Sequence, residues 1–294
     1  MAETRKAYIT DVSDEQWALI GPELERLTPP KGHGPTRTVS LREVFNTIQY
    51  QARTGCQWAL LPHDLLPKST VYEYFAMWRD NGTFDRINAM LVGTVRTSID
   101  PAKEVHPTAG SIDSKTVPST QACEDRGYDG GKKIRGRKRN IAVDTLGLLL
   151  AVSVTLASVD DAEAARSLVP QLDDTAQPRL EVMWADNKYH NYALYDHLEG
   201  HPKVHWRLEV VRRPTGVKGF VLLPKRWVVE RTFAWQDRYR RLSKDYERRA
   251  SSAEAWVKVT SITRMLRYLK PSPDQRPYGY REKPGSRAIG VQIV

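Results

Sequence analysis

The hydrophobic pattern of the chain changes near residue 105, and this change constrains the fold more than any other feature. Before it, apolar residues recur at spacings of three and four, which is typical of the buried face of an α-helix. After it, short runs of β-forming residues are separated by helical stretches. The pattern predicts a helical part over residues 1–98 and a mixed α/β part over residues 105–270, in which helices cover a sheet.

The N-terminal part contains four predicted helices with recognisable start signals. Ser13 with Gln16, and Ser40 with Glu43, have the spacing of a capping box, each ahead of an apolar helical run. The fourth helix is predicted over residues 84–96, after an Asn-Gly pair that ends the third.

The third predicted helix follows a connection that contains two prolines. Ser69 is its candidate N-cap. The polar residues expected to contact DNA at its start are Lys68, Ser69, Thr70 and Tyr72. This arrangement suits a helix-turn-helix reader of a DNA groove. A plain helical bundle, with the aromatic residues in its core, explains the same pattern.

The α/β part predicts the order strand, β-hairpin, helix, strand, helix, strand and long helix, followed by one more helix. The segments are 111–117, 140–156, 160–172, 180–186, 189–198, 204–212, 226–242 and 252–269. Residues 271–294 are rich in proline, glycine and charge, and we expect them to form a loose tail.

The charge of the chain points to a polyanionic partner, because the formal net charge is +10 and the pI is near 9.5. Cys56 and Cys123 have no neighbouring cysteine, so we expect free thiols in a reducing cytosol. The longest mostly apolar stretch, 146–159, is too short to span a bilayer, and no signal-peptide pattern is present. We therefore expect a cytoplasmic protein with no membrane partner. Without a G-x-x-x-x-G-K-[ST] loop, no nucleotide cofactor is expected.

Three carboxylates stand out by position. Asp113 lies within a predicted strand, Asp186 ends a strand of buried character, and Glu230 lies on a strongly basic helix. Each also has an ordinary explanation: a strand-end turn, a helix cap and an arginine partner. If the first and fourth predicted strands are neighbours, the two aspartates meet, and a packed helix brings the glutamate to them. Such a set suits two hard divalent cations that promote phosphoryl transfer.

Asp160 and Asp161 form a second acidic feature of the α/β part. The pair is a candidate for a further metal site, but negative charge at the start of the predicted helix is a sufficient explanation for it.

Motifs in a fixed order run along most of the chain. They include Ser69-Thr-Val-Tyr-Glu-Tyr-Phe-Ala-Met-Trp, Ile112-Asp-Ser-Lys-Thr-Val, the stretch 131–154, Trp184-Ala-Asp-Asn-Lys-Tyr and Arg226-Trp-Val-Val-Glu-Arg-Thr-Phe-Ala-Trp. Together they resemble the DDE transposases of bacterial insertion sequences, in the insertion-sequence-5 family of the insertion-sequence-4 superfamily.

The resemblance implies a ribonuclease-H-like catalytic core with a metal-binding triad at Asp113, Asp186 and Glu230. It implies Mg²⁺ as the cofactor, with Mn²⁺ able to substitute. It also implies cleavage of double-stranded DNA at transposon ends and transfer of the freed 3′-hydroxyl to target DNA. Because two ends need two active sites, we expect a homodimer on DNA, associated with a bacterial nucleoid.

The chain departs from the family signature at two places. Arg226 matches the arginine placed four residues before the glutamate, but the tyrosine expected three residues earlier is Leu223. The lysine expected seven residues after Glu230 is Asp237. The basic residues that would replace those phosphate contacts are Arg231, Arg238, Arg240, Arg241 and Lys244.

A basic run before the hairpin is a further candidate DNA contact. Its members are Lys132, Lys133, Arg135, Arg137, Lys138 and Arg139. A solvated charge run explains the same pattern, but the basic net charge and the adjoining strand of Asp113 favour contact with the DNA backbone.

The function predicted from these observations is that of a transposase, in which the helical part recognises terminal inverted repeats and the α/β part cuts and joins DNA. Two alternatives stay open. One is another ribonuclease-H-like nuclease, such as a resolvase. The other is a catalytically silent DNA-binding regulator derived from a transposase, for which the departures at Leu223 and Asp237 leave room.

Overall fold

The computed structural model describes residues 5–30, 37–212 and 225–272. Its N-terminal part consists of α1 (Asp14–Leu27), α2 (Leu41–Thr54), the 3₁₀ turn η1 (Trp58–Leu60), α3 (Lys68–Asp80) and α4 (Thr83–Ile99). The four predicted helices are confirmed. The tail expected over 271–294 lies almost entirely outside the described residues.

The helix starts follow the predictions in part. Ser13 and Gln16 form both hydrogen bonds of a capping box. Ser40 accepts the backbone N–H of Glu43, but the carboxylate of Glu43 turns toward Arg5 rather than back to the cap. The N-cap of α3 is Pro67, so the prediction that Ser69 caps this helix is wrong. Pro67 has a fixed φ of −54° and leads the chain directly into the first turn.

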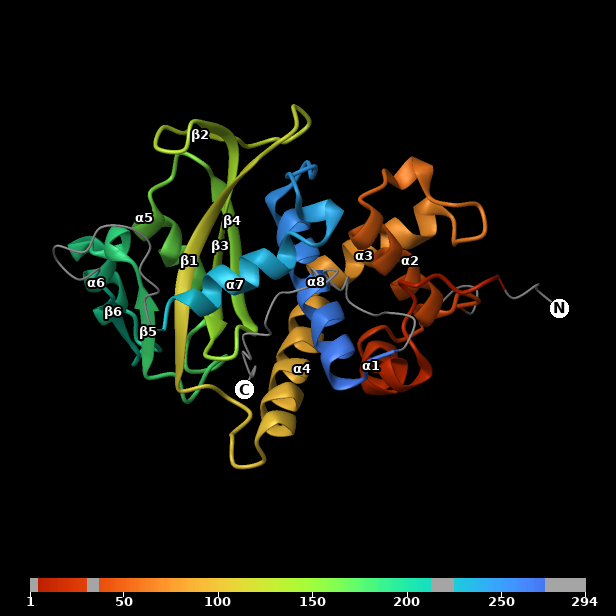
Figure 1. Ribbon diagram of the computed structural model, residues 1–294, viewed down its shortest axis with the longest axis horizontal. Coiled ribbons are helices and arrows are strands. Elements are labelled where there is room, and N and C mark those ends of the chain that lie inside the picture. The colour runs from red at the N-terminus through yellow and green to blue at the C-terminus, as the bar shows by residue number, and fades with distance from the viewer. Residues whose placement is uncertain (1–4, 31–36, 213–224, 273–294) are drawn as a thin grey trace, which may run out of the picture.

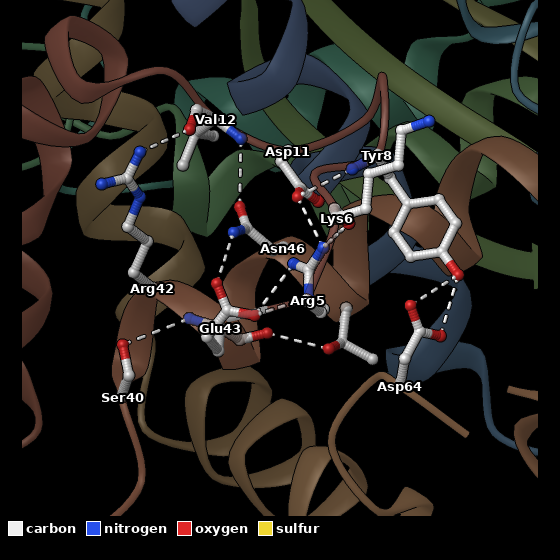
Figure 2. Close-up of polar contacts among 11 residues, drawn as sticks. Arg5, Lys6, Tyr8, Asp11, Val12, Ser40, Arg42, Glu43, Asn46 and Asp64 are labelled. Carbon is white, nitrogen blue, oxygen red and sulfur yellow. Dashed lines mark hydrogen bonds and ion pairs between the residues drawn. The ribbon is translucent and has the colours of Figure 1, made fainter. Parts of the chain in front are cut away.

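A polar network ties the segment before α1 to α2 (Figure 2). The guanidinium of Arg5 donates to Asp11 at 2.7 Å and to Glu43 at 2.8 Å. The buried amide oxygen of Asn46 accepts the N–H of Val12 at 3.0 Å. These contacts fix the entry of the chain into the helical part.

Among the described residues, the sheet has six strands: β1 (Ala109–Pro118), β2 (Gly127–Asp129), β3 (Ile134–Asp144), β4 (Leu149–Leu156), β5 (Val182–Ala185) and β6 (Arg207–Val210). β3 pairs antiparallel with β1 on one side and β4 on the other, and its first residues also pair with β2. β1, β5 and β6 run parallel to one another. The predicted strands and hairpin are confirmed, whereas β2 lies between the predicted segments 111–117 and 140–156, where no strand is predicted.

The connecting and C-terminal helices are α5 (Asp161–Ala165), η2 (Arg166–Gln171), η3 (Asn187–Tyr189), α6 (Tyr192–Glu199), α7 (Trp227–Gln236), η4 (Arg240–Leu242) and α8 (Ala250–Leu269). The prediction of one helix from 226 to 242 is wrong at its C-terminal end. Tyr239 is extended, with φ −102° and ψ 117°, and a 3₁₀ turn then buries Leu242. The apolar residues beyond Gln236 are therefore buried by a bend of the chain and not by a continued helix.

The sheet has an apolar core on each face. In β3, Ile141 and Val143 belong to the core shared with α7 and α8, while Ala142 belongs to the core under α5 and α6. This alternation follows from the two-residue period of a strand. α7 lies across the sheet, and α8 stands between the sheet and the N-terminal helices (Figure 1).

α8 connects the helical part to the sheet through a single apolar core. The indole of Trp256 on α8 stacks on Phe75 of α3, with ring centroids 4.6 Å apart. The division into residues 1–98 and 105–270 stays a prediction, and the two parts share side chains of one core. Nowhere in the described ranges is a helix long and apolar enough to cross a membrane.

Candidate active site

β1 positions Asp113 under α7. Ile112 packs into the core below α5 and α6, so Asp113, the next residue along the strand, faces the opposite side, where α7 lies (Figure 1). Ser111, on the same face as Asp113, donates its hydroxyl to the carbonyl of Lys225 at 2.6 Å. This bond holds the start of α7 above the strand.

β5 positions Asp186 beside Asp113. The two strands are parallel, with Ser111 opposite Trp184, so the two aspartates, each two residues further on, come to the same level. The condition under which the two aspartates are expected to meet, that the first and fourth predicted strands are neighbours, is fulfilled. Asp186 also caps η3, because its carboxylate accepts the N–H of Lys188 at 2.9 Å.

Arg226 brings the three predicted acidic residues together. Its Nη2 lies 3.6 Å from Asp113 Oδ2, 3.8 Å from Asp186 Oδ2 and 3.9 Å from Glu230 Oε1. Glu230 follows Arg226 by four residues, one turn along α7. The side chain of Glu230 is 54% exposed, whereas those of Asp113 and Asp186 are mostly covered.

Burial raises the pKa of Asp113 to about 6, and the nearby carboxylates of Asp186 and Glu230 act in the same direction. The N–H of Ser114 and the guanidinium of Arg226 oppose this rise. A carboxylate in this environment is stabilised by any cation placed between it and its neighbours.

The donor set fits a hard divalent cation in its chemistry. Carboxylate oxygens are the ligands that Mg²⁺ and Mn²⁺ prefer, and here three carboxylates converge on one cationic group. Within the described ranges, no three His, Cys, Asp or Glu side chains are spaced as a ready metal site. A guanidinium lies between the carboxylates instead, so binding a metal there requires Arg226 to move aside.

Asp161 is a fourth carboxylate near this site, and it is held by ion pairs. It lies 2.7 Å from Lys138 Nζ and 3.6 Å from Lys188 Nζ, and it accepts the hydroxyl of Ser114 at 2.7 Å. Burial raises its pKa, but the bonds from Lys138 and Ser114 outweigh burial and the net shift is downward. Asp160 is the N-cap of α5, which agrees with the explanation of this acidic pair as negative charge at the start of a helix.

Two residues near the acids were not singled out by the sequence. Tyr189 is buried, and burial together with the carboxylates of Asp113 and Asp161 raises the pKa of its hydroxyl well above the ordinary value. Lys115 contacts both carboxylate oxygens of Asp237, at 2.5 and 2.6 Å. Lys115 lies two residues after Asp113, so the alternation of side chains along a strand puts the two on the same face. This spacing could have identified Lys115 from the sequence.

The basic run divides into an exposed and a buried half. Lys132, Lys133 and Arg135 are exposed. Arg137 and Arg139 are only 1% and 2% exposed. Arg137 donates to three backbone carbonyls and pairs with Asp245, while Arg139 donates to two carbonyls.

Lys138 is buried too, paired with Asp161. The expectation that the whole run contacts DNA is therefore corrected by the structure, because the guanidinium groups of Arg137 and Arg139 and the amine of Lys138 are occupied inside the protein. Only the exposed half faces solvent.

The remaining candidate contacts also differ in exposure. Arg238, Arg240 and Lys244 are exposed, and Arg231 is half-buried. Arg241 is buried, with its guanidinium 2.5 Å from Glu247. Leu223 lies outside the described residues.

On α3, Lys68, Ser69 and Tyr72 are exposed and Thr70 is half-buried. The core positions of this helix are Val71, Phe75 and Trp78. The polar residues are therefore available to a partner, and most of the large apolar ones are not.

Comparison with known proteins assigns the family. The family model described as "Transposase DDE domain" matches residues 106–265, and that described as "Putative transposase of IS4/5 family" matches residues 12–88. A putative transposase for insertion sequence element IS402 of Burkholderia cepacia is 34% identical over 137 residues. The match covers 42% of this chain and 60% of that relative's length.

These matches agree with the mixed sheet and its covering helices, which form a ribonuclease-H-like core. The matched DDE region includes β1, β5 and α7, on which the three converging carboxylates lie. The chain belongs to the DDE transposase family, of the IS4/5 type.

Proposed function

We propose that this protein binds the terminal inverted repeats of a transposon, cuts DNA at the ends and joins the freed 3′-hydroxyl to target DNA. The observation that carries the proposal is the convergence of Asp113, Asp186 and Glu230 on one guanidinium, from three elements distant in sequence. Carboxylates assembled in this way are expensive to keep together unless a cation neutralises them.

The three carboxylates would hold the divalent ions, with Mg²⁺ as the cofactor and Mn²⁺ as a substitute. When bound, such ions activate the attacking oxygen and stabilise the leaving oxygen of a phosphodiester. Arg226, released from the carboxylates, is positioned to bind the phosphate that reacts. Exposed cations around the site hold the flanking backbone; they are Lys132, Lys133, Arg135, Arg238, Arg240 and Lys244.

Two successive displacements complete the reaction. Water attacks the phosphodiester at the transposon end and releases a 3′-hydroxyl. That hydroxyl then attacks a phosphodiester of the target and releases another 3′-hydroxyl, so no covalent enzyme intermediate is required. Two ends must be processed together, and the acting form is a homodimer on DNA in the bacterial nucleoid.

The helical part recognises the repeats through the exposed start of α3. Lys68, Ser69, Thr70 and Tyr72 contact the DNA, while the opposite side of the helix packs into the core. This assignment is supported by the polar exposed face and by the overall charge of +10.

The test uses a labelled duplex that carries the element's own end, with and without Mg²⁺. Asp186→Asn is the diagnostic variant, because asparagine keeps the acceptor that caps η3 and removes only the charge. Asp174→Asn is the matched control, since Asp174 pairs with His205 away from the three carboxylates. We expect metal-dependent nicking by the wild type and the control, and a loss of at least about a hundredfold in Asp186→Asn.

A pre-cut end with a free 3′-hydroxyl then distinguishes a transposase from a resolvase-like nuclease, because only the former joins it to a second duplex. Specific binding without cleavage in Mg²⁺ or Mn²⁺ would contradict the catalytic proposal. The silent regulator, which the replacement of the family lysine by Asp237 favours, would then be the better description.

A further inference from the structure

Five arginines gather around Trp235 and Tyr239, where the end of α2, α7, its C-terminal extension and α8 meet. We call this set the arginine cluster; its members are Arg53, Arg231, Arg238, Arg264 and Arg267. Across residues 5–30, 37–212 and 225–272, none of the five forms an ion pair with an Asp or Glu side chain. Such a concentration of unpaired positive charge is unfavourable without an anion.

Arg264 is the innermost member. Its Cζ lies 3.1 Å from the ring centroid of Trp235, and the guanidinium of Arg231 lies 4.5 Å from the same centroid. Burial, together with the positive charge of Arg231, lowers the pKa of Arg264 to about 9. Among the residues that the structure describes, its one hydrogen bond to the protein is a long one, 3.5 Å, to the carbonyl of Gly147. A half-buried guanidinium with so weak a hydrogen bond is stabilised by a negative group placed beside it.

A small pocket beside Arg264 lies between α7 and α8. Its lining is mainly apolar and includes Trp235, Tyr239 and Ser261. Within the described residues, the Oε1 atom of Gln236 is buried and has no hydrogen-bond partner. This atom is an acceptor, so the groups here that can bind phosphate oxygens are the guanidinium groups of the cluster.

The cluster lies across α7 from the carboxylates. Glu230 faces Asp113 and Asp186, whereas Arg231, the next residue, turns to the β3–β4 hairpin and donates to the carbonyl of Leu146 at 3.0 Å. The exposed side chain of Arg238 extends the positive charge outward from the pocket. A duplex that lies over α7 therefore meets the carboxylates at one place and the cluster at another.

We propose that the arginine cluster binds a phosphate of the DNA backbone, with Arg264 as its innermost contact. The ligand follows from the proposed function, but the site itself is separate from the carboxylates and from the basic run before the hairpin. Its role is to fix the register of the duplex on α7, because phosphate contacts position a duplex without reading its sequence.

The experiment measures duplex binding at several salt concentrations, without divalent metal so that no cleavage occurs. The variants are Arg264→Gln, Arg264→Lys and the control Arg179→Gln, whose exposed side chain pairs with Glu104. Losing one phosphate contact reduces the magnitude of the slope of log affinity against log salt by about 0.9. When salt is lowered from 1 M to 0.1 M, the variant therefore gains about eightfold less affinity for the duplex than the wild type does. We expect this loss for Arg264→Gln, and near-wild-type slopes for Arg264→Lys and the control.

Thermal unfolding in inorganic phosphate and in chloride at equal ionic strength separates the possible sources of the anion. If phosphate stabilises the wild type but not Arg264→Gln, while the DNA slopes are the same, the cluster binds a free anion and the assignment to DNA is overturned. If wild type binds the duplex and Arg264→Gln matches it in both measurements, the inference fails while the proposed function stands.

If wild type itself does not bind the duplex, the proposed function fails as well. Reduced slopes in both Arg264→Gln and Arg264→Lys would mean that the stacked guanidinium has a structural role, which also contradicts the inference.

Discussion

Arg226 Nη2 lies 3.6 Å from Asp113 Oδ2, and the same nitrogen lies 3.8 Å from Asp186 and 3.9 Å from Glu230, so one guanidinium of the protein neutralises all three carboxylates. The guanidinium and a divalent ion need the same oxygens. We therefore expect a metal bound at these oxygens to displace Arg226 and to leave the guanidinium available to a phosphate. The following predictions begin from this competition.

Arg226→Gln is expected to raise the affinity for Mn²⁺ in the absence of DNA, by about tenfold, because the metal no longer has to displace an internal counter-ion. Titration calorimetry measures this directly. Arg240→Gln removes the same charge from an exposed position and serves as the control. An affinity for Mn²⁺ that is unchanged or weaker in Arg226→Gln would show that the arginine supports the metal rather than competing with it.

The pKa of Asp113 predicts a pH dependence of metal binding. Since the pKa is raised to about 6, the carboxylate is increasingly protonated below that pH and cannot bind a cation. Mn²⁺ affinity is expected to fall as the pH is lowered from 7 to 5. Binding that stays constant over this range would contradict the assignment of Asp113 as a ligand.

The same pKa has a consequence for stability in metal-free buffer. The folded protein keeps a proton on Asp113 between the unfolded pKa of 3.8 and about 6, so this group lowers the free energy of unfolding as the pH rises through that window. Asp113→Asn removes the effect. Relative to the wild type, it should gain up to about 3 kcal/mol between pH 4 and pH 7, measured by urea unfolding.

The core of the candidate site could be predicted because it depends on short-range patterns. The strands around Asp113 and Asp186 have clear apolar runs, and Glu230 lies one helical turn after Arg226. The parallel pairing that joins the aspartates is long-range, and the sequence patterns offered it only as one possible strand order.

The environment of individual cations could not be predicted, because it depends on partners far along the chain. Arg137 looks like part of a solvated run, yet it pairs with Asp245, 108 residues away. That Arg264 has no acidic partner among the described residues likewise depends on which side chains reach the space between α7 and α8. Charge alone does not distinguish these situations, and only the packed structure does.

Gly136 is predicted to be intolerant of any side chain. A Cβ atom there would overlap the carbonyl oxygen of Val117 and lie 2.9 Å from the amide of Ser119, both in or next to the paired strand β1. Gly136→Ala should lower the free energy of unfolding by about 2 kcal/mol or more, since backbone atoms cannot rotate away. Gly130→Ala is the matched control, because nothing lies within 4 Å of a Cβ at that position. Equal stability of the two variants would contradict the close approach.

Removal of the Asp144 carboxylate is predicted to lower the free energy of unfolding substantially. This carboxylate is fully buried, lies 2.6 Å from Arg96 and accepts the N–H groups of Leu146 and Leu148, each at 2.9 Å. Asp144→Ala leaves a buried guanidinium without its counter-ion and the turn without its acceptor, so we expect a loss of about 3–5 kcal/mol in urea unfolding.

Two comparisons show whether this loss comes from the buried pair. Asp144→Asn keeps an oxygen acceptor for the turn and should lose less, because only the charge is removed. Glu104→Ala breaks an exposed ion pair with Arg179 and should change stability by less than about 1 kcal/mol. If Asp144→Ala cost no more than Glu104→Ala, Arg96 would have to be satisfied by its bond to the carbonyl of Glu104 alone, and the pair would not stabilise the hairpin.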